Sequence, residues 1–327
     1  MTLAVIGSGS WATALVKVLC NHVKRLNWYI REPEIRKSVV SEKFNCVYMS
    51  SIQFDTTKIW VFDDADEAVR HSEVLLFAVP AAFLKVTTES MSVKFTEKMV
   101  FSAIKGIVPG ENITVGEYFN QRFDLPFDRF GVVSGPTHAE EIALERLSYL
   151  TVACKDRAMA ELMTAHLNCR YIKTVISTDI YGIEYGGIIK NIVALCAGVA
   201  HGLGYGDNFT AALVSNGFAE IKRFLEQTYP AERTVEQSAY LGDLLVTCYS
   251  QFSRNRTFGA MIGKGYSVKS AQLEMNMVAE GYYAAACIHE INKRYNIDLP
   301  IIDAVYHILY ENSSPGVEIR LLSERFH

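Results

Sequence analysis

Short apolar runs alternate with longer segments of mixed polarity over roughly the first half of the chain. The runs have the length of strands, and most segments between them are long enough to form a helix. Continuous apolar strands separated by helices are typical of a parallel sheet that is covered on both faces. The predicted strands are Leu3–Ile6, Leu26–Ile30, Ile59–Phe62, Val74–Val79, Met99–Ala103, Gly131–Val133 and Leu150–Cys154.

The pattern changes after about residue 178. Residues 181–204 are apolar on nearly every side and show no strand alternation, which predicts a buried helix. Further helices are predicted over residues 209–228, 237–249, 257–263, 268–273, 279–294 and 301–311. We therefore expect a Rossmann-like, doubly wound α/β domain over residues 1–178 and an all-helical domain over residues 179–327.

Composition narrows the class of protein. The 327 residues carry a net charge of −4, which argues against a general nucleic-acid binder because such a protein needs a basic face. The seven cysteines are scattered without a Cys-x-x-Cys pair, so we expect reduced thiols in a cytoplasmic protein and no metal site. The first predicted strand begins at once, so we expect no leader peptide, and the lack of a long uninterrupted apolar run predicts no membrane span.

The segment "AVIGSGSWATAL" is the first candidate for chemistry. Gly7 and Gly9 follow a predicted strand and precede a predicted helix. Gly7 permits a tight turn, and Gly9 lets a pyrophosphate approach the backbone at the helix N-terminus. Ala12 replaces the third glycine of the dinucleotide-binding fingerprint and is still small enough for close packing. The alternative is an ordinary strand–helix turn.

The end of the second predicted strand bears on the choice of dinucleotide. NAD-specific proteins usually carry an acidic residue there, which binds the ribose hydroxyls. This chain has Arg31, followed by Glu32. An arginine suits the 2′-phosphate of NADP, whereas the alternative is a solvated charge in a loop.

Two further segments follow predicted strands, where open α/β sheets bind their ligands. Lys105 in "AIKGI" can point toward a substrate, although a lone lysine is more often at the surface. In "SGPTHAEE", Gly135 turns the chain and Thr137 can cap a helix. Its functional interpretation is a second backbone cradle for the cofactor. His138 is a weaker acid–base candidate.

Lys190 is a charge inside the long apolar segment. Burial would lower its pKa and make it a proton donor or acceptor near neutral pH. Its alternative is a lysine that extends to the surface from a partly buried helix. Asp243, in the apolar run "YLGDLLVTC", is the best carboxylate partner, and Asn191 can orient a substrate or a partner side chain. Asp243 can also cap the helix that follows.

Ser253, Arg254, Asn255 and Arg256 form a compact group of hydrogen-bond donors in "SRNRTFG". Such a group suits a phosphate or a carboxylate. A solvated turn has the same composition.

Taken in order, the motifs resemble those of the bacterial NAD(P)-dependent glycerol-3-phosphate dehydrogenases. The resemblance extends to about residue 311 and rests on "GSGSWATAL", "AIKGI", "SGPTHAEE", "GGIIKN", "HGLGYGDN", "YLGDLLVTC", "SRNRTFG" and "VAEGY". It implies a Rossmann-like domain followed by a 6-phosphogluconate-dehydrogenase-like helical domain, usually in a homodimer. Departures from the family pattern include Ala12, Phe209–Thr210 and Asn216, where arginines are common at the last two sites.

The resemblance also implies roles for individual residues. Lys190 would be the proton donor or acceptor, held by Asp243. The cofactor contacts would be Gly7, Gly9, Ser10, Trp11, Arg31, Lys105, Ala139, Arg254, Val278 and Glu280. The substrate contacts would be Lys105, Gly135, Thr137, Lys190, Asp243, Ser253, Arg254 and Asn255.

The implied reaction is the NADH- or NADPH-dependent reduction of dihydroxyacetone phosphate to sn-glycerol 3-phosphate, which supplies glycerophospholipid synthesis. Two alternatives stay open at this point. One is a related two-domain reductase of the hydroxyacid or ketopantoate type. The other is a dinucleotide-binding sensor without catalysis, which the presence of both Lys190 and Asp243 disfavours.

Overall fold

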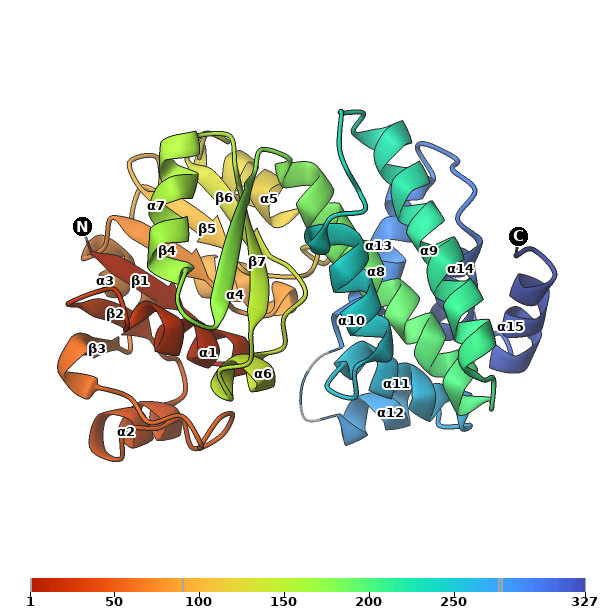
Figure 1. Ribbon diagram of the computed structural model, residues 1–327, viewed down its shortest axis with the longest axis horizontal. Coiled ribbons are helices and arrows are strands. Elements are labelled where there is room, and N and C mark those ends of the chain that lie inside the picture. Colours follow the sequence, from red (N-terminus) through yellow and green to blue (C-terminus); the bar gives the residue numbers. More distant parts are fainter. Residues whose placement is uncertain (1, 90, 276, 278, 327) are drawn as a thin grey trace. The chain divides into compact units, whose positions relative to one another are not determined.

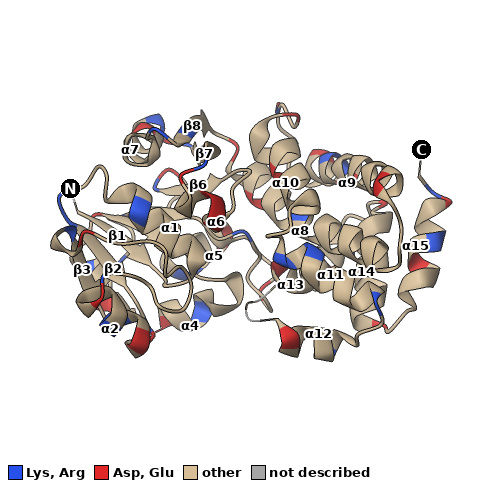
Figure 2. Cartoon of the chain, turned by 60° about the horizontal axis from the view of Figure 1, so that its bottom comes forward, with Lys and Arg blue, Asp and Glu red and all other residues tan. Residues whose placement is uncertain are grey.

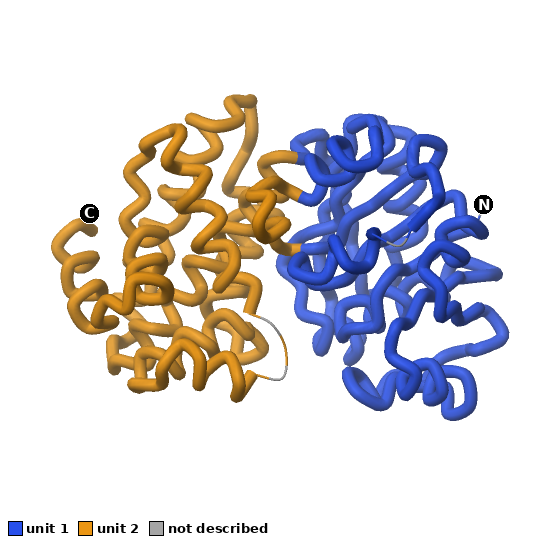
Figure 3. The backbone as a smooth tube through the Cα atoms, turned by 180° about the vertical axis from the view of Figure 1, so that it is seen from behind, with its two compact units in different colours: residues 1–104, 115–180 blue, residues 105–114, 181–327 orange. Residues whose placement is uncertain are grey.

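The computed structural model describes residues 2–89, 91–275, 277 and 279–326. These residues form two compact units, shown in Figure 3. Unit 1 comprises residues 1–104 and 115–180, and unit 2 comprises residues 105–114 and 181–327. The short segment 105–114, which contains Lys105, therefore belongs to the helical unit although its flanking segments belong to the sheet unit.

Unit 1 is built around one eight-stranded sheet with the order β3-β2-β1-β4-β5-β6-β7-β8 (Figure 1). All neighbouring strands are parallel except β6 and β7. The strands are β1 (Leu3–Ile6), β2 (Leu26–Tyr29), β3 (Ile59–Phe62), β4 (Val74–Phe77), β5 (Met99–Ser102), β6 (Phe130–Ser134), β7 (Ser148–Cys154) and β8 (Ile172–Ser177). Since β1 lies between β2 and β4, the chain reverses its winding direction at β1, where open sheets of this type bind ligands.

Helices connect most of these strands. They are α1 (Ser10–Leu19), α2 (Pro33–Ser41), α3 (Ala65–Arg70), α4 (Leu84–Glu89), α5 (Val115–Phe123), α6 (Ala139–Ala143) and α7 (Arg157–Leu167), with short 3₁₀ turns η1 (Thr56–Lys58) and η2 (Ala81–Phe83). Asp156 starts α7 by accepting hydrogen bonds from the backbone N–H groups of Ala158 and Met159, which is a strong N-terminal signal.

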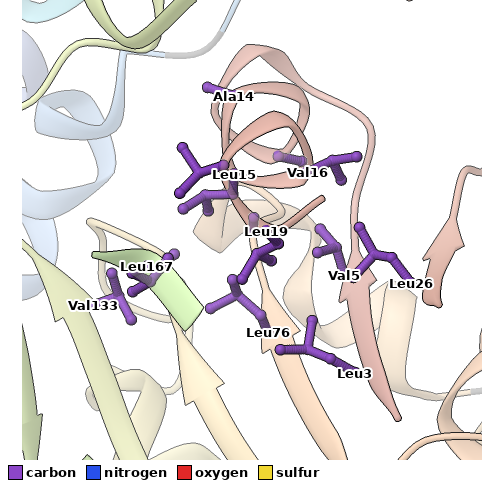
Figure 4. Close-up of a cluster of buried hydrophobic side chains, with 14 of the residues drawn as sticks. Leu3, Val5, Ala14, Leu15, Val16, Leu19, Leu26, Leu76, Val133 and Leu167 are labelled. Atoms are coloured by element: carbon purple, nitrogen blue, oxygen red, sulfur yellow. The ribbon is translucent and has the colours of Figure 1, made fainter. Parts of the chain in front are cut away.

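One core cluster of unit 1 lies between α1 and the sheet, as Figure 4 shows. Leu15 and Leu19 of α1 are fully buried with Val5 of β1 and Leu76 of β4. Burying each such side chain contributes about 1.5–3 kcal/mol relative to its exposure to water. This packing holds the N-terminus of α1 at the end of β1.

Unit 2 is helical in its described residues. Its elements are α8 (Ile180–Gly202), α9 (Asp207–Thr228), the short π-helix η3 (Ser238–Gly242), α10 (Asp243–Tyr249), α11 (Arg254–Gly263), α12 (Val268–Glu274), α13 (Glu280–Asn292), α14 (Pro300–Tyr310) and α15 (Pro315–Ser323). The ribbon of α8 is mostly tan in Figure 2, because few of its residues are charged.

Within the described residues, α8 has the length and hydropathy of a membrane-spanning helix. The whole of its apolar window is buried inside the protein, as expected of a core helix. A helix whose sequence is apolar all round is typically buried in this way.

The fold class agrees with the sequence prediction, and the differences have physical causes. The expected all-parallel sheet is wrong at β7, which runs antiparallel to β6. The strand β8 was not predicted because its residues alternate weakly between buried and exposed positions. The helix α15 was also missed.

Candidate functional site

The turn between β1 and α1 has the geometry of a phosphate cradle. Gly7 adopts φ +126°, and a Cβ atom there would lie 2.8 Å from the carbonyl oxygen of Ala78. A Cβ atom on Gly9 would meet nothing within 4 Å, and no side chain caps α1. The backbone at Gly9 is thus open to an incoming anion at the positive end of a helix.

Two buried residues that sequence reasoning missed support this turn. Asn45 donates hydrogen bonds to the carbonyl oxygen of Ser8 and to Oγ1 of Thr13, both at 2.9 Å. The Thr13 hydroxyl lies 2.9 Å from the carbonyl oxygen of Gly9. Asn45 lies in an irregular segment 32 residues after Thr13, so no periodicity in the sequence could have linked them.

Arg31 and Glu32 follow β2 and lie beside the same turn. Glu32 accepts a hydrogen bond from the Ser8 hydroxyl at 2.5 Å and forms an ion pair with Arg31 at 2.9 Å. Hydrogen bonds from Ser8 and Arg31 lower the pKa of Glu32, although burial opposes them. The guanidinium of Arg31 also lies over the Phe83 ring, 5.6 Å from its centroid. Both a carboxylate and a guanidinium therefore lie at the end of β2, the position from which sheets of this type contact the ribose of a dinucleotide.

The segment after β6 forms a second tight turn in unit 1. Gly135 adopts φ +136°, and a Cβ atom there would lie 2.6 Å from the carbonyl oxygen of Tyr149. The expectation that Thr137 caps the next helix is wrong. The Thr137 hydroxyl donates to the carbonyl oxygen of Gly135 at 3.2 Å, and His138 occupies the N-cap of α6 without a side-chain cap. Ala139 is the first residue of α6 and is buried.

Ser10 and Trp11, the other predicted cofactor contacts in unit 1, form the first turn of α1. Ser10 is buried. The indole N–H of Trp11 donates to the carbonyl oxygen of Ala103 at 3.1 Å. This bond ties the start of α1 to the end of β5, so these two residues lie at the same edge of the sheet as the glycine turn.

Lys190 lies in the middle of α8 and is only 3 % exposed. Its ammonium forms an ion pair with Asp243, the first residue of α10, which is 1 % exposed. It also donates to the hydroxyl of Thr247 at 3.1 Å. The surface alternative for Lys190 is thereby excluded. The N-cap of α10 is Gly242 and no side chain caps this helix, so Asp243 pairs with Lys190 and does not act as the cap.

Lys105 completes this cluster. Its Nζ lies 3.5 Å from Oδ2 of Asp243, so one buried carboxylate is shared by two lysines. Burial lowers the pKa of Lys190 from 10.5 to about 7, since desolvation outweighs the attraction of Asp243 and Lys105 adds repulsion. A lysine with this pKa can donate a proton as the ammonium or accept one as the neutral amine at neutral pH.

Thr247 was missed by sequence reasoning. It lies four residues after Asp243 on α10, and its hydroxyl donates to the backbone carbonyl of Asp243 at 2.6 Å. Helical spacing from Asp243 was the signal that could have found it, because residues four apart share one helix face.

The donor group around residue 254 begins a helix, which corrects the expectation of a loop. Ser253 is the N-cap of α11, and its hydroxyl accepts from the backbone N–H of Arg256. Arg254 is the first helical residue, and Asn255 is buried. A helix N-terminus adds oriented N–H groups to the guanidinium of Arg254, which together suit a phosphate.

Glycines let α11 approach the backbone of α8. A Cβ atom on Gly259 of α11 would collide with the carbonyl oxygen of Leu195, and one on Gly198 of α8 would collide with that of Arg256. These two helices therefore touch through their main chains. The contact fixes the start of α11 relative to Lys190.

Glu280 is the first residue of α13, and Val278 lies outside the described residues. Unit 2 thus brings together Lys105, Lys190 and Asp243, with Asn255 nearby through Asn191. Gly7, Gly9, Ser10, Trp11, Arg31, Gly135, Thr137 and Ala139 belong to unit 1. Among the described residues, no group of three or more His, Cys, Asp or Glu side chains could hold a metal ion.

A doubly wound sheet with a glycine cradle, followed by helices that bury a lysine–carboxylate cluster, defines the class of dinucleotide-dependent oxidoreductases. Comparison with known families narrows this class. Residues 2–160 match the family model described as NAD-dependent glycerol-3-phosphate dehydrogenase N-terminus, and residues 179–320 match its C-terminus.

Curated relatives agree over nearly the full length. A glycerol-3-phosphate dehydrogenase [NAD(P)+] from an Exiguobacterium species is 33% identical over 325 residues, covering 99% of this chain and 95% of the relative. One from Chlorobium chlorochromatii is 32% identical, covering 95% and 94%. The chain belongs to the NAD-dependent glycerol-3-phosphate dehydrogenase family.

Solved structures show the same fold. The glycerol-3-phosphate dehydrogenase of Coxiella burnetii superposes with a TM-score of 0.91 at 27% identity, covering 99% of this chain and 98% of that one. The enzyme of Saccharomyces cerevisiae gives a TM-score of 0.82 at 25% identity, covering 97% and 98%. The family resemblance inferred from the sequence motifs is confirmed.

Proposed function

We propose that this protein catalyses the reversible, NAD(P)H-dependent reduction of dihydroxyacetone phosphate to sn-glycerol 3-phosphate. The observation that carries the proposal is the buried cluster of Lys105, Lys190 and Asp243 in a chain of this family. A ketone needs a hydride at its carbon and a proton at its oxygen. The reduced nicotinamide supplies the hydride when it is bound.

The residues of unit 1 fit a dinucleotide. The open backbone at Gly9 and the uncapped N-terminus of α1 suit a pyrophosphate, and Gly7 keeps the turn tight. Ser10, Trp11, Arg31 and Ala139 are the further contacts that we assign to the cofactor in this unit. From unit 2 we assign Lys105, Arg254, Glu280 and Val278.

Lys190 is the group that we assign to proton transfer. In the reducing direction its ammonium donates a proton to the carbonyl oxygen as negative charge develops there. Asp243 and Thr247 hold the ammonium in place. General acid help of this kind contributes roughly a hundred- to ten-thousand-fold in rate.

The phosphate of the substrate is assigned to the start of α11. Ser253, Arg254 and Asn255 offer hydroxyl, guanidinium and amide groups beside helix N–H groups. Gly135, Thr137 and Lys105 complete the assigned substrate contacts. Binding of the phosphate fixes the position of the carbonyl carbon for hydride transfer. Such positioning can lower the activation barrier by about 7–11 kcal/mol.

The cellular role is part of the same proposal. The product is the backbone of glycerophospholipids, so we propose that the enzyme supplies their synthesis in the cytoplasm. We also propose a homodimer, as is usual in the family. Sedimentation at several concentrations measures the mass of the assembly, and a monomer throughout would contradict it.

Nicotinamide absorbance provides the direct test of function. Purified protein should oxidise NADH or NADPH when dihydroxyacetone phosphate is added. Arg254→Ala should raise the apparent KM for this substrate by about tenfold or more, because a charge-assisted bond to phosphate is lost. Protein that binds a dinucleotide and turns over neither cofactor would refute the proposal.

The ratio of kcat/KM for NADPH and NADH tests the residue pair after β2. Arg31→Ala should lower this ratio because the 2′-phosphate loses its cation, while NADH turnover changes little. If Arg31→Ala left the ratio of kcat/KM for NADPH and NADH unchanged, Arg31 would not take part in cofactor recognition.

A further inference from the structure

Three helices of unit 2 are joined by a chain of buried amide hydrogen bonds. Asn191 of α8 donates from Nδ2 to the carbonyl oxygen of Lys105 at 2.8 Å and to that of Gly187 at 3.1 Å. Asn255 of α11 donates from Nδ2 to Oδ1 of Asn191 at 2.9 Å. The backbone N–H of Gly281, in the first turn of α13, donates to Oδ1 of Asn255 at 2.8 Å.

The direction of this chain is fixed at both ends. The Gly281 main-chain N–H can only donate, so the Asn255 oxygen must face it. The Lys105 carbonyl can only accept, so the Asn191 nitrogen must face it. Because both amides are thereby oriented, the nitrogen of Asn255 meets the oxygen of Asn191 and no flipped arrangement satisfies every group.

Burial makes the chain costly to break. Asn191 is 4 % exposed and Asn255 is 7 % exposed. Removing one partner leaves buried polar groups without hydrogen bonds, and each such group costs about 1–3 kcal/mol. The approach at Gly281 is also close, since a Cβ atom there would lie 2.6 Å from the carbonyl oxygen of Asn191.

Both ends of the chain lie beside residues assigned to the reaction. At one end, the side chain of Lys105 lies 3.5 Å from Asp243, the partner of Lys190. At the other end, Gly281 follows Glu280, which starts α13. A displacement at either end is therefore transmitted through two oriented amides, of which Asn191 also donates to the carbonyl oxygen of Gly187.

We propose that Asn191 and Asn255 are positioning residues, acting as one relay that fixes the main chain at Lys105 to the start of α13. The relay keeps the Lys105 ammonium beside Asp243 while Glu280 is held for the cofactor, and this role rests on the proposed function. Asn255 retains a second N–H on Nδ2, so the relay is compatible with a phosphate contact. The two roles make different predictions for paired substitutions.

The first test is a double-mutant cycle on kcat/KM with dihydroxyacetone phosphate. Asn191→Ala and Asn255→Ala should each lower kcat/KM by about tenfold or more, because small misplacements of catalytic groups are costly. If the residues act as one relay, kcat/KM of the double variant should lie within about twofold of the more impaired single variant. Losses that multiply would overturn the relay.

The second test needs no turnover. Asn191→Ala should speed hydrogen exchange at the Gly281 amide, although the Asn191 side chain does not touch that group. An unchanged exchange rate at Gly281 would contradict the proposal. If the wild-type protein fails to reduce dihydroxyacetone phosphate, this readout still judges the relay separately from the proposed function.

Asn292→Ala is the matched control. Asn292 is the last residue of α13. Its side chain accepts a hydrogen bond from the backbone N–H of Ile297 at 2.9 Å and donates one to the carbonyl oxygen of Ile297 at 2.8 Å. Its loss should lower thermal stability while kcat/KM stays within about twofold of wild type, since the bonded groups lie at the far end of the helix. A kinetic loss in Asn292→Ala equal to that in Asn191→Ala would show general destabilisation and refute a specific relay.

Discussion

Lys190 shows how one side chain changes its chemistry when a helix is buried. A lysine in water keeps its proton until pH 10.5, but the desolvated Lys190 has a pKa of about 7. The carboxylate of Asp243 keeps the ammonium from losing its proton at still lower pH, while Lys105 acts against it. The three charges together set the pH at which the proton moves.

This balance predicts opposite pH dependences for the two directions. In the proposed mechanism, reduction needs protonated Lys190, so its kcat should fall as pH rises through about 7. Oxidation needs the neutral amine, so its kcat should rise over the same range. Rate profiles recorded in both directions test the assignment.

Lys190→Ala should remove both pH dependences and lower kcat by roughly a hundred- to ten-thousand-fold. Lys222→Ala is the control, because Lys222 is an exposed lysine of α9 that pairs with Glu226. Turnover of Lys190→Ala within a few-fold of wild type would show that another group transfers the proton.

The sequence predicted this residue because a charge inside an apolar segment needs an explanation. It also predicted Asp243 as the partner, by the same contrast with its neighbours. Thr247 and Asn45 were not predicted, because a polar residue on a helix or in a loop has many ordinary roles. In the folded chain Thr247 accepts a hydrogen bond from the ammonium of Lys190, and Asn45 donates one to the carbonyl oxygen of Ser8, and these contacts indicate their functions.

Main-chain contact between α8 and α11 fixes the start of α11, which we propose as the phosphate site, relative to Lys190, the proposed proton donor. Gly259→Ala should lower the free energy of unfolding by about 1–3 kcal/mol, since an added methyl group meets the backbone of α8. It should also raise the KM for dihydroxyacetone phosphate, because Arg254 moves with α11. Denaturant unfolding and steady-state kinetics measure the two effects.

Gly206→Ala serves as the comparison for that variant. A Cβ atom on Gly206 would meet nothing within 4 Å. Its substitution should leave the KM unchanged, and an equal increase in both variants would argue against the α8–α11 contact as the cause.

A second contact between helices depends on pH. Glu220 of α9 is 1 % exposed and accepts hydrogen bonds from the backbone N–H groups of Ile301 and Ile302 at the start of α14. Burial raises the pKa of Glu220 from 4.5 to about 8, although the two hydrogen bonds oppose this change. The folded chain therefore binds a proton here that the unfolded chain releases between these pH values.

Wild-type stability should therefore fall relative to Glu220→Gln as pH rises from about 4.5 to about 8. Within this window the expected slope is on the order of 1 kcal/mol per pH unit. Unfolding experiments on both proteins across this range measure the difference. Glu226→Gln, an exposed change on the same helix, is the control, and its free energy of unfolding should differ from that of wild type by the same amount at every pH. A difference between Glu220→Gln and wild type that did not change with pH would contradict the raised pKa of Glu220.

Two strands have the predicted ends although their burial differs. Leu3–Ile6 is fully buried, whereas Ile59 is the one buried residue of Ile59–Phe62. The reversed direction of β7 could not be predicted, because an apolar strand carries no sign of its direction. The start of α11 was taken for a loop because its first residues are polar and charged, which is also typical of a solvated turn.

At the scale of the whole molecule, the helical unit is assembled from two separate stretches of chain. Residues 105–114 leave the sheet unit after β5 and return to it before α5. Within this segment Val108 and Ile113 pair through a backbone hydrogen bond of 3.1 Å. No sequence pattern indicated that residues 105–114 belong to the helical unit, because a ten-residue segment between a strand and a helix resembles an ordinary connection.

Hydrogen exchange can establish which unit stabilises this segment. Leu76→Ala in the core of unit 1 should cost about 2–5 kcal/mol and speed exchange in β5 and α5. The amides of Val108 and Asn112 should instead keep the protection of unit 2. Leu195→Ala in α8 should instead speed exchange at Val108 and Asn112 and leave β5 and α5 protected. If the exchange rate of Val108 changed together with that of β5 in both variants, residues 105–114 would not belong to unit 2.

The excursion of residues 105–114 has a consequence for recombination between related genes. A crossover near codon 178 transfers everything that follows as one block, and Asp243 and Lys190 travel together in it. Lys105 stays behind with the recipient, although its ammonium belongs beside the transferred carboxylate. Each hybrid therefore inherits its charge cluster from two parents, and a functional library of such chimaeras requires parents that agree at the Lys105 segment.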